Sequence, residues 1–444
     1  MYINHLELHN FRCFDKLELD FHNQLTVIVG GNGAGKTAIL EATAIAAGTF
    51  FNGMDAIRSI PIKSTDAKYA YYTSGSEQDL QQTYPVEVSA RGTIDNERIS
   101  WKRSLNGIDG KTTIKDAAAI IEKTKEIQSR LRKGDKSLIL PIIAYYGTGR
   151  MWDFHREKQE GKIPVNTKTN GYIDCLDGNA NAKLMKKWFK KMTITNYQRV
   201  EENLGTMPEF EVVCEAMAKC LSLTTDYSDV AFKYSLTADE IVVFYTDVHG
   251  NRMRLPLNQL SDGYKCTISM VADIAYRMAT LNPQLLSGIL TGTPGIVLID
   301  EVDLHLHPEW QQRILADLIS IFPKVQFIVS THAPAVINTV GGEHIVIVNN
   351  NTVTSSPTDT FGRDVNTIVQ TIMKSSERPK EIKELFENFY SAMDSMDYKV
   401  AEHFLVFLER TIGDTDPECA SCRMRYDLEV LGFGDEYDSN QETE

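Results

Sequence analysis

The residues best suited to chemistry in this chain form a phosphate-binding pattern near the N-terminus. Residues 30–37 read GGNGAGKT and satisfy G-x-x-x-x-G-K-[ST]. The apolar run 25–30 predicts a buried strand before the pattern, and the alanine-rich segment after it predicts a helix. In such a turn, backbone N–H groups wrap around phosphates. The residues assigned to this loop are Gly30, Asn32, Gly33, Ala34, Gly35, Lys36 and Thr37.

Two side chains of this loop have distinct expected roles. We expect Lys36 to reach the β- and γ-phosphates of a nucleotide. The hydroxyl of Thr37 is expected to be a ligand of Mg²⁺. The alternative, a glycine-rich turn without a ligand, fits less well because both flanking elements have the character that the pattern requires.

A pair of acids follows a second apolar run. The sequence PGIVLIDEVD places Asp300 and Glu301 directly after a predicted core strand. The carboxyl end of a strand faces the ligand crevice in open α/β sheets. Asp300 is suited to hold Mg²⁺ through water, and Glu301 is suited to activate the attacking water. The alternative is a pair of acids that cap the next helix.

A histidine follows a third apolar run. His332 comes after VQFIVST and is expected at the same sheet edge as Asp300. There it could bind a γ-phosphate or orient water, or it could be a structural histidine with satisfied hydrogen bonds.

The stretch 258–270, NQLSDGYKCTISM, predicts the start of a helix. Ser261 or Asp262 would be its cap, and Gly263 would allow the turn. A helix N-terminus offers free N–H groups and positive potential, which suit an anion.

Strands that alternate with helices and lead into a glycine-rich turn predict an α/β fold with a parallel core. Segments 86–92 and 97–105 alternate with period two and predict an antiparallel β subdomain beside it. From residue 363 onward the pattern predicts helices and then an acidic tail.

Composition predicts a globular, cytoplasmic protein. Hydrophobic residues make up 42% and charged residues 24% of the chain, and no apolar run is long enough for a membrane helix. The seven cysteines are mostly scattered, which fits a reducing compartment. Cys419 and Cys422 have CxxC spacing without a second metal-binding pair, so we interpret them as helix-packing residues.

Charge is distributed unevenly although the formal net charge is −14. Residues 101–200 hold 21 lysines and arginines against 10 acidic residues, whereas residues 401–444 hold 3 against 12. The basic segment is a candidate surface for nucleic acid, and a solvated helical face is an equally good interpretation.

Five motifs in this order resemble the ABC-type ATPases of the SMC and RecF kind: NFRCF, GGNGAGKT, LSDGY, VLIDEVDLHLHP and VSTHAP. Within this broad SMC, RecF and OLD-like group, the chain looks most similar to the stand-alone ATPases of bacterial anti-phage defence, in particular the Septu type of the PtuA family. YYGTGR at 145–150 and the segment FGRDVNTIVQTIM strengthen that resemblance, which spans nearly the whole chain.

The resemblance implies a composite site for ATP and Mg²⁺. LSDGY is similar to the signature motif, in which Ser261 and Gly263 would bind the γ-phosphate of ATP held by a second copy. Asp303 lies where such ATPases touch the opposing subunit, and His332 matches their switch histidine. ATP would then join two heads into a dimer, and hydrolysis would release them.

The resemblance also implies a division of the chain. Residues 1–147 would form the first part of an ABC-type P-loop ATPase head with its mixed and antiparallel β subdomain, and 148–229 a basic helical insertion. Residues 230–360 would complete the head with the signature and Walker B motifs, and 361–444 would form a helical C-terminal region. The family usually has a magnesium-binding glutamine at the position of AYYGTGRMW, residues 144–152, and this stretch contains none. Gly147 and Arg150 are candidates for a related role there.

Only 112 residues follow His332, and their helical pattern lacks the acidic α/β arrangement of a nuclease domain. The resemblance implies that DNA cleavage comes from a partner, an HNH nuclease, and retron RNA or DNA is a further candidate partner. Two other functions stay open: a RecF-like DNA-repair ATPase that loads on DNA, and a scaffold that binds ATP without hydrolysing it.

Overall fold

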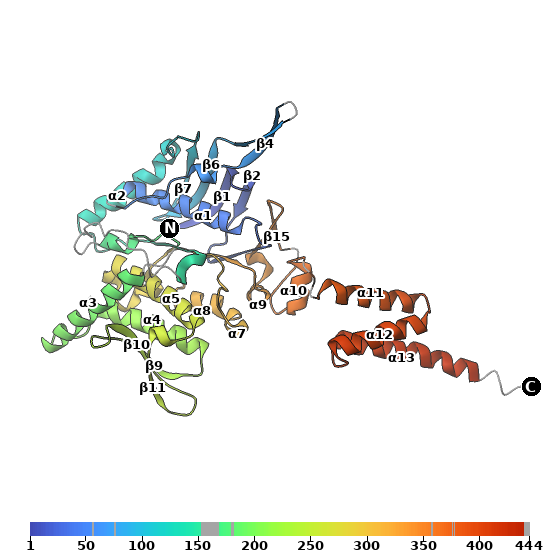
Figure 1. Ribbon diagram of the computed structural model, residues 1–444. Coiled ribbons are helices and arrows are strands. Elements are labelled where there is room, and N and C mark those ends of the chain that lie inside the picture. The colour runs from blue at the N-terminus through green and yellow to red at the C-terminus, as the bar shows by residue number, and fades with distance from the viewer. Residues whose placement is uncertain are drawn as a thin grey trace, which may run out of the picture. The chain divides into compact units, whose positions relative to one another are not determined.

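A computed structural model describes residues 1–55, 57–74, 77–151, 168–178, 182–356, 358–374, 376 and 378–438 (Figure 1). The chain divides into two compact units, Met1–Ile368 and Val369–Glu444. Residues 152–167 and 179–181 of the predicted insertion, and the acidic tail after residue 438, lie outside the described residues. Among the described residues, no helix has both the length and the apolar character that crossing a bilayer requires.

The centre of the first unit is a six-stranded mixed sheet of order β15-β14-β3-β13-β12-β8. Every neighbouring pair is parallel except β14 and β15, which form an antiparallel hairpin. The three strands that lead into the predicted site residues are buried along their whole length. The strands are β3 (Leu25–Gly30), β8 (Ile142–Tyr146), β12 (Gly295–Ile299), β13 (Val325–Thr331), β14 (Ile345–Asn349) and β15 (Thr352–Ser355).

An antiparallel sheet of order β2-β1-β6-β7 forms a second layer, as the alternating segments predicted. Helix α1 (Lys36–Gly48) is almost entirely buried and contacts strands of both sheets, so it lies between the two layers (Figure 1). The strands are β1 (Tyr2–Phe11), β2 (Phe14–Asp20), β6 (Val86–Ile94) and β7 (Glu97–Leu105). The α/β fold class with an antiparallel subdomain is therefore confirmed.

Smaller elements complete this unit. A two-stranded ribbon and a three-stranded sheet flank the layers; their strands are β4 (Tyr69–Ser74), β5 (Glu77–Gln82), β9 (Ser228–Ser235), β10 (Glu240–Thr246) and β11 (Arg252–Pro256). Helices α4 and α5 pack against each other, and α5 also contacts β8. The helices are α2 (Ala118–Arg132), α3 (Ala182–Glu201), α4 (Pro208–Thr224), α5 (Asp262–Leu281), α6 (Ile289–Gly292), α7 (Pro308–Gln311), α8 (Ile314–Ile321) and α9 (Pro334–Ile337). The boundary between the two units falls within α10 (Val365–Thr371).

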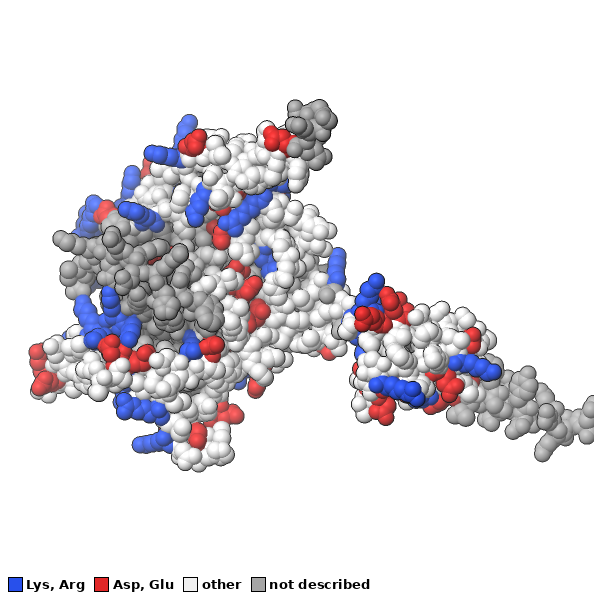
Figure 2. All heavy atoms as spheres, viewed as in Figure 1, with Lys and Arg blue, Asp and Glu red and all other residues white. Residues whose placement is uncertain are grey.

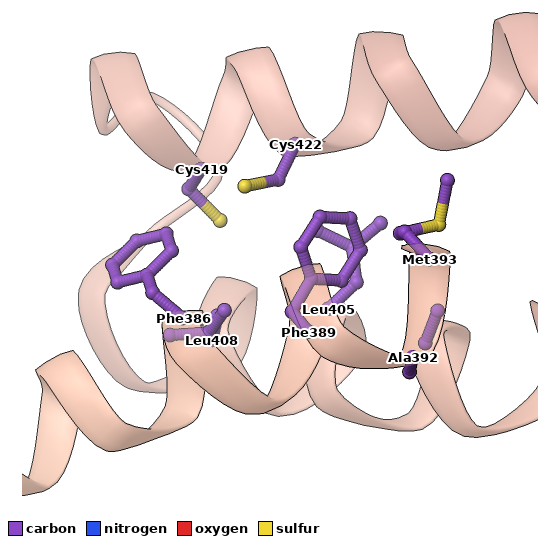
Figure 3. Packing of buried hydrophobic residues seen from close by; sticks show 9 residues of the cluster. Phe386, Phe389, Ala392, Met393, Leu405, Leu408, Cys419 and Cys422 are labelled. Atoms are coloured by element: carbon purple, nitrogen blue, oxygen red, sulfur yellow. The ribbon is translucent and has the colours of Figure 1, made fainter. Parts of the chain in front are cut away.

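The second unit is built around three helices: α11 (Lys380–Asp394), α12 (Tyr398–Ile412) and α13 (Pro417–Asp438). Their common core contains the aromatic rings of Phe386 and Phe389 and both cysteines of the CxxC pair (Figure 3). Cys419 and Cys422 are free thiols that are 0% and 1% exposed. Their interpretation as helix-packing residues is confirmed.

Candidate functional site: a nucleotide site at the carboxyl edge of the sheet

The glycine-rich loop connects the last residue of β3 to the first turn of α1. A Cβ at Gly30 would lie 2.4 Å from the carbonyl oxygen of Val348 on the neighbouring strand. Gly35 has φ +102°, and a Cβ there would lie 2.5 Å from the ring of Phe14. The tight packing of backbone against its neighbours therefore requires glycine at both positions.

Lys36 is 6% exposed, and its ammonium group donates hydrogen bonds to the carbonyl oxygens of Gly30 (2.9 Å) and Gly31 (3.0 Å). Burial lowers its pKa below the ordinary value, and the nearby carboxylates of Asp300, Glu301 and Asp303 oppose that shift. The amine is thus held within the loop, where phosphate oxygens would be stronger acceptors than the neutral carbonyls.

Thr37 and Asp300 meet although 263 positions separate them in sequence. The Thr37 hydroxyl donates to one carboxylate oxygen of Asp300 at 2.7 Å. Asp300 is 1% exposed, and its backbone N–H donates to the carbonyl of Tyr146 at 2.8 Å. A hydroxyl and a carboxylate are hard oxygen ligands of the kind Mg²⁺ prefers, so the residues present fit the expected metal.

Ser330, to which no sequence motif assigned a role, forms hydrogen bonds with Asp300 and Glu301, the two acids of the Walker B motif. Its hydroxyl donates to the other carboxylate oxygen of Asp300 at 2.5 Å and accepts from the N–H of Glu301 at 2.8 Å. Glu301 has φ +48°, a conformation that a non-glycine residue adopts at some cost. The bond from its N–H to Ser330 supports this conformation. The available signal was a serine near the end of an otherwise apolar strand, VQFIVST.

Asp303 and His332 lie in the same neighbourhood. The hydroxyl of Thr331, the residue before His332, donates to Asp303 at 2.5 Å. The pKa of His332 is lowered by burial and by the positive charge of Lys36, against the opposing influence of the three carboxylates. The structure therefore brings Lys36, Thr37, Asp300, Glu301, Asp303 and His332 to one edge of the sheet.

The signature residues Ser261 and Gly263 lie at the start of α5, apart from the sheet edge that carries the phosphate loop. Ser261 is the N-cap of α5, and its side chain makes no capping bond. A Cβ at Gly263 would lie 2.7 Å from the carbonyl of His305, and the Tyr264 and Trp310 ring centroids are 3.8 Å apart. These residues line a cavity of about 690 Å³ that contains none of the phosphate-loop residues. Action of Ser261 and Gly263 on a second copy's nucleotide stays a prediction.

A buried network lies where the sequence lacked the expected glutamine. The hydroxyl of Tyr146 donates to Asp273 of α5 at 2.8 Å, and Arg277 donates to the same carboxylate oxygen at 2.7 Å. Arg277 also donates to the carbonyls of Gly171 and Ile173, each at 2.9 Å. Since the carbonyl of Tyr146 accepts from Asp300, this network joins the signature helix to the Walker B strand. The side chain of Arg150 lies outside the described residues.

The chain is similar to one described domain family and to several named proteins. Residues 5–205 match the family described as "AAA domain". Over 88% of its length the chain is 26% identical to the retron Vc95 probable ATPase of Vibrio cholerae, 83% of which is covered. It is 24% identical over 98% of its length to the retron Ec83 probable ATPase of Escherichia coli, with 88% covered. The Septu protein PtuA of Bacillus thuringiensis is 24% identical over 75% of the chain, with 72% covered.

The resemblance to ABC-type ATPases of anti-phage defence is confirmed. Among solved structures, the SMC head bound to the C-winged helix domain of ScpA matches at 16% identity and a TM-score of 0.44, covering 80% of this chain and 97% of that one. RecF of Leptospira interrogans matches only 45 residues, at 49% identity, which is 10% of this chain and 12% of that protein.

Proposed function

We propose that the chain is an ATPase whose complete sites form between two copies and whose nucleotide state controls a partner nuclease. The observation that carries the ATPase part is the bond between Thr37 and Asp300, beside Lys36 and Glu301. It joins the two expected magnesium ligands, which are 263 positions apart in the sequence, at the end of the phosphate-binding loop.

The residues at the sheet edge support a division of labour in hydrolysis. Lys36 binds the β- and γ-phosphates of ATP, while Thr37 and Asp300 hold Mg²⁺, directly and through water. Mg²⁺ held by these two residues would neutralise charge that develops on the transferred phosphoryl group. Glu301 orients a water molecule and accepts its proton as the water oxygen attacks the γ-phosphorus and ADP leaves. Neutral His332 donates its ring N–H to a γ-phosphate oxygen or accepts a hydrogen bond from the attacking water.

The start of α5, with Ser261 exposed and Gly263 buried behind it, is the part of the site that acts on a second copy. Its free N–H groups and the positive end of a 20-residue helix suit a γ-phosphate. Since the cavity around Ser261 holds no residue of the chain's own phosphate loop, a second copy is the natural source of the nucleotide. The hydroxyl of Thr331 donates to Asp303 and so fixes it near His332. The position of Asp303 would therefore depend on the nucleotide bound by its own copy and on the nucleotide bound by the second copy.

The function in defence rests on the relatives and on the resemblance to Septu systems, whose ATPase is paired with an HNH nuclease. We propose that ATP-dependent pairing of heads holds such a nuclease inactive and that a change in nucleotide state frees it. The acidic C-terminal region is the proposed dock. Deletion after Phe361 should abolish co-purification with the nuclease from the neighbouring gene, and retained co-purification would contradict this dock.

Hydrolysis itself is tested with Glu301→Gln, which keeps the shape of the side chain but removes its basicity. Turnover should fall about 100-fold or more, within the range for removal of a general base, while ATP binding persists and paired heads accumulate. Glu122→Gln, at an exposed position of α2, is the matched control. Unchanged turnover in Glu301→Gln would instead support a scaffold that only binds ATP.

A further inference from the structure

A second large hollow of the first unit lies at the amino ends of the parallel strands. This groove has a volume of about 980 Å³ and is lined by the β6–β7 hairpin, by β1, and by the residues just before β3 and β13. The phosphate loop, Asp300 and His332 follow the carboxyl ends of strands of the same sheet. The groove is therefore separate from the nucleotide site.

Three basic side chains on the groove wall lack a partner of opposite charge. Arg91, Arg98 and Lys324 are exposed, and within the described part of the chain none of their side chains forms an ion pair or hydrogen bond. The nearby carboxylate of Asp20 is 2.6 Å from His5. On the β6–β7 hairpin, the carboxylate of Glu97 lies 2.8 Å from Lys123, so it is also engaged elsewhere.

The register of the hairpin places the two arginines on one face. Arg91 lies opposite Ser100, and Arg98 is two residues from Ser100 on the same strand. Such diagonal neighbours are about 7–8 Å apart and within reach of long side chains, so the two positive charges lie close together on one face. A bound anion would offset their repulsion.

Several basic side chains of segment 101–200 are paired with acids or buried within the fold. Lys102 pairs with Glu87 at 3.0 Å, and Lys190 pairs with Asp239 at 2.6 Å. Arg103 is 4% exposed and donates to backbone and to Ser59 inside the fold. On the face shown in Figure 2, basic and acidic side chains lie interspersed over the first unit. Part of the positive charge counted from sequence is therefore neutralised locally.

We propose that this groove binds a nucleic-acid strand through its phosphates, with Arg91, Arg98 and Lys324 as the phosphate contacts. Its volume is near the upper end for a site that holds one small ligand. Basic side chains from three elements along it favour a chain of repeated phosphates over a single phosphate. Phosphate contacts of this kind fix position without reading sequence, so binding depends on salt and little on base composition.

The test measures binding of fluorescently labelled 30-nucleotide single-stranded DNA to the full chain. Fluorescence anisotropy gives the affinity at salt concentrations between 50 and 200 mM. The triple variant Arg91→Gln/Arg98→Gln/Lys324→Gln should bind at least tenfold more weakly at 100 mM salt. Its salt slope should fall by roughly two to three, about one for each lost contact. Its turnover of ATP should match the unaltered chain, because the groove lies away from the nucleotide site.

The matched control removes the same charge from the segment that the sequence favoured. Lys111, Lys115 and Lys133 are exposed, and their replacement by glutamine should leave the affinity within twofold. The proposal is overturned if the groove variant binds like the unaltered chain, if the control weakens binding equally, or if the unaltered chain does not bind the DNA at 50 mM salt. None of these results would bear on ATP hydrolysis, so the two proposals fail separately.

Discussion

The Thr37 hydroxyl lies 2.7 Å from the Asp300 carboxylate, and this contact joins the phosphate-binding loop to the strand that carries the two acids. Ser330 holds the other oxygen of the same carboxylate. Asp300 therefore has a fixed orientation, with one oxygen directed toward the start of α1.

Loss of the Thr37 hydroxyl should weaken magnesium-dependent ATP binding. Hydrogen bonds to charged groups contribute about 1.5–3 kcal/mol, which corresponds to roughly 10- to 100-fold in affinity. Thr37→Val keeps the shape of the side chain and should show that loss when ATP binding is titrated against Mg²⁺. Thr37→Ser keeps the hydroxyl and should bind nearly as well as the unaltered chain. Equal affinity of the valine and serine variants would contradict a role for the hydroxyl at the metal.

Acid should remove the contribution of His332 to turnover. Its pKa lies below the ordinary value near 6.5 because of burial and the charge of Lys36, so the ring is neutral at pH 7 and gains a proton only as the pH falls below that value. The ratio of turnover in the unaltered chain to turnover in His332→Asn isolates this ring, because other titrating groups are common to both. The ratio should be constant above pH 7 and should decrease below pH 6.5.

His249→Asn, in the exposed turn between β10 and β11, provides the control for this profile. Its ratio to the unaltered chain should stay near one across the range. A constant ratio for His332→Asn down to pH 5 would show that protonation of the ring does not affect the reaction.

Tyr146→Phe should destabilise the first unit more than Tyr172→Phe, although both hydroxyls are buried. The Tyr146 hydroxyl donates to the charged Asp273, whose other carboxylate oxygen is buried without a hydrogen-bond partner. The Tyr172 hydroxyl donates to the neutral carbonyl of Pro141 at 2.7 Å. Losses of about 1.5–3 and about 0.5–1.5 kcal/mol are expected. Denaturant unfolding measures both, and equal losses would argue against the network as a strong link.

Part of this site was predictable because its residues come in strings with local logic. The loop 30–37 and the acids after β12 each follow an apolar strand, and parallel strands end at a shared edge, so their meeting follows from the fold class. Ser330 was not predictable in this way, because a single serine in a buried strand has no spacing that assigns a partner. Its role depends on the neighbouring strand in the sheet, which sequence order does not reveal.

The segment PEWQQRILADLISIFP shows a similar limit at the level of helices. Its apolar periodicity predicts one continuous helix from Pro308, but the structure has a short α7 and then α8 from Ile314. Trp310 packs on Tyr264 beside the signature residues, while Ile314, Leu315 and Leu318 are buried in the core. A contact made by one turn with a distant helix competes with local helical continuity, and only the folded chain shows the result.

The composite site makes a strict prediction for Ser261→Arg. A long cation in place of the small N-cap should block pairing of heads but spare ATP binding by Lys36 on the same chain. Sedimentation with and without ATP would measure pairing, and nucleotide titration would measure binding. Unchanged ATP-driven pairing would return residues 258–270 to the status of an ordinary helix start.

Mixing two inactive variants tests the shared site most directly. Ser261→Arg keeps an intact phosphate loop, and Lys36→Ala keeps an intact signature, so each variant alone should hydrolyse almost no ATP. A mixed pair contains one complete site, built from Lys36 of one copy and Ser261 of the other. ATP turnover should therefore reappear when the two variants are mixed at equal concentration. No recovery on mixing, or full turnover by Ser261→Arg alone, would contradict the shared site.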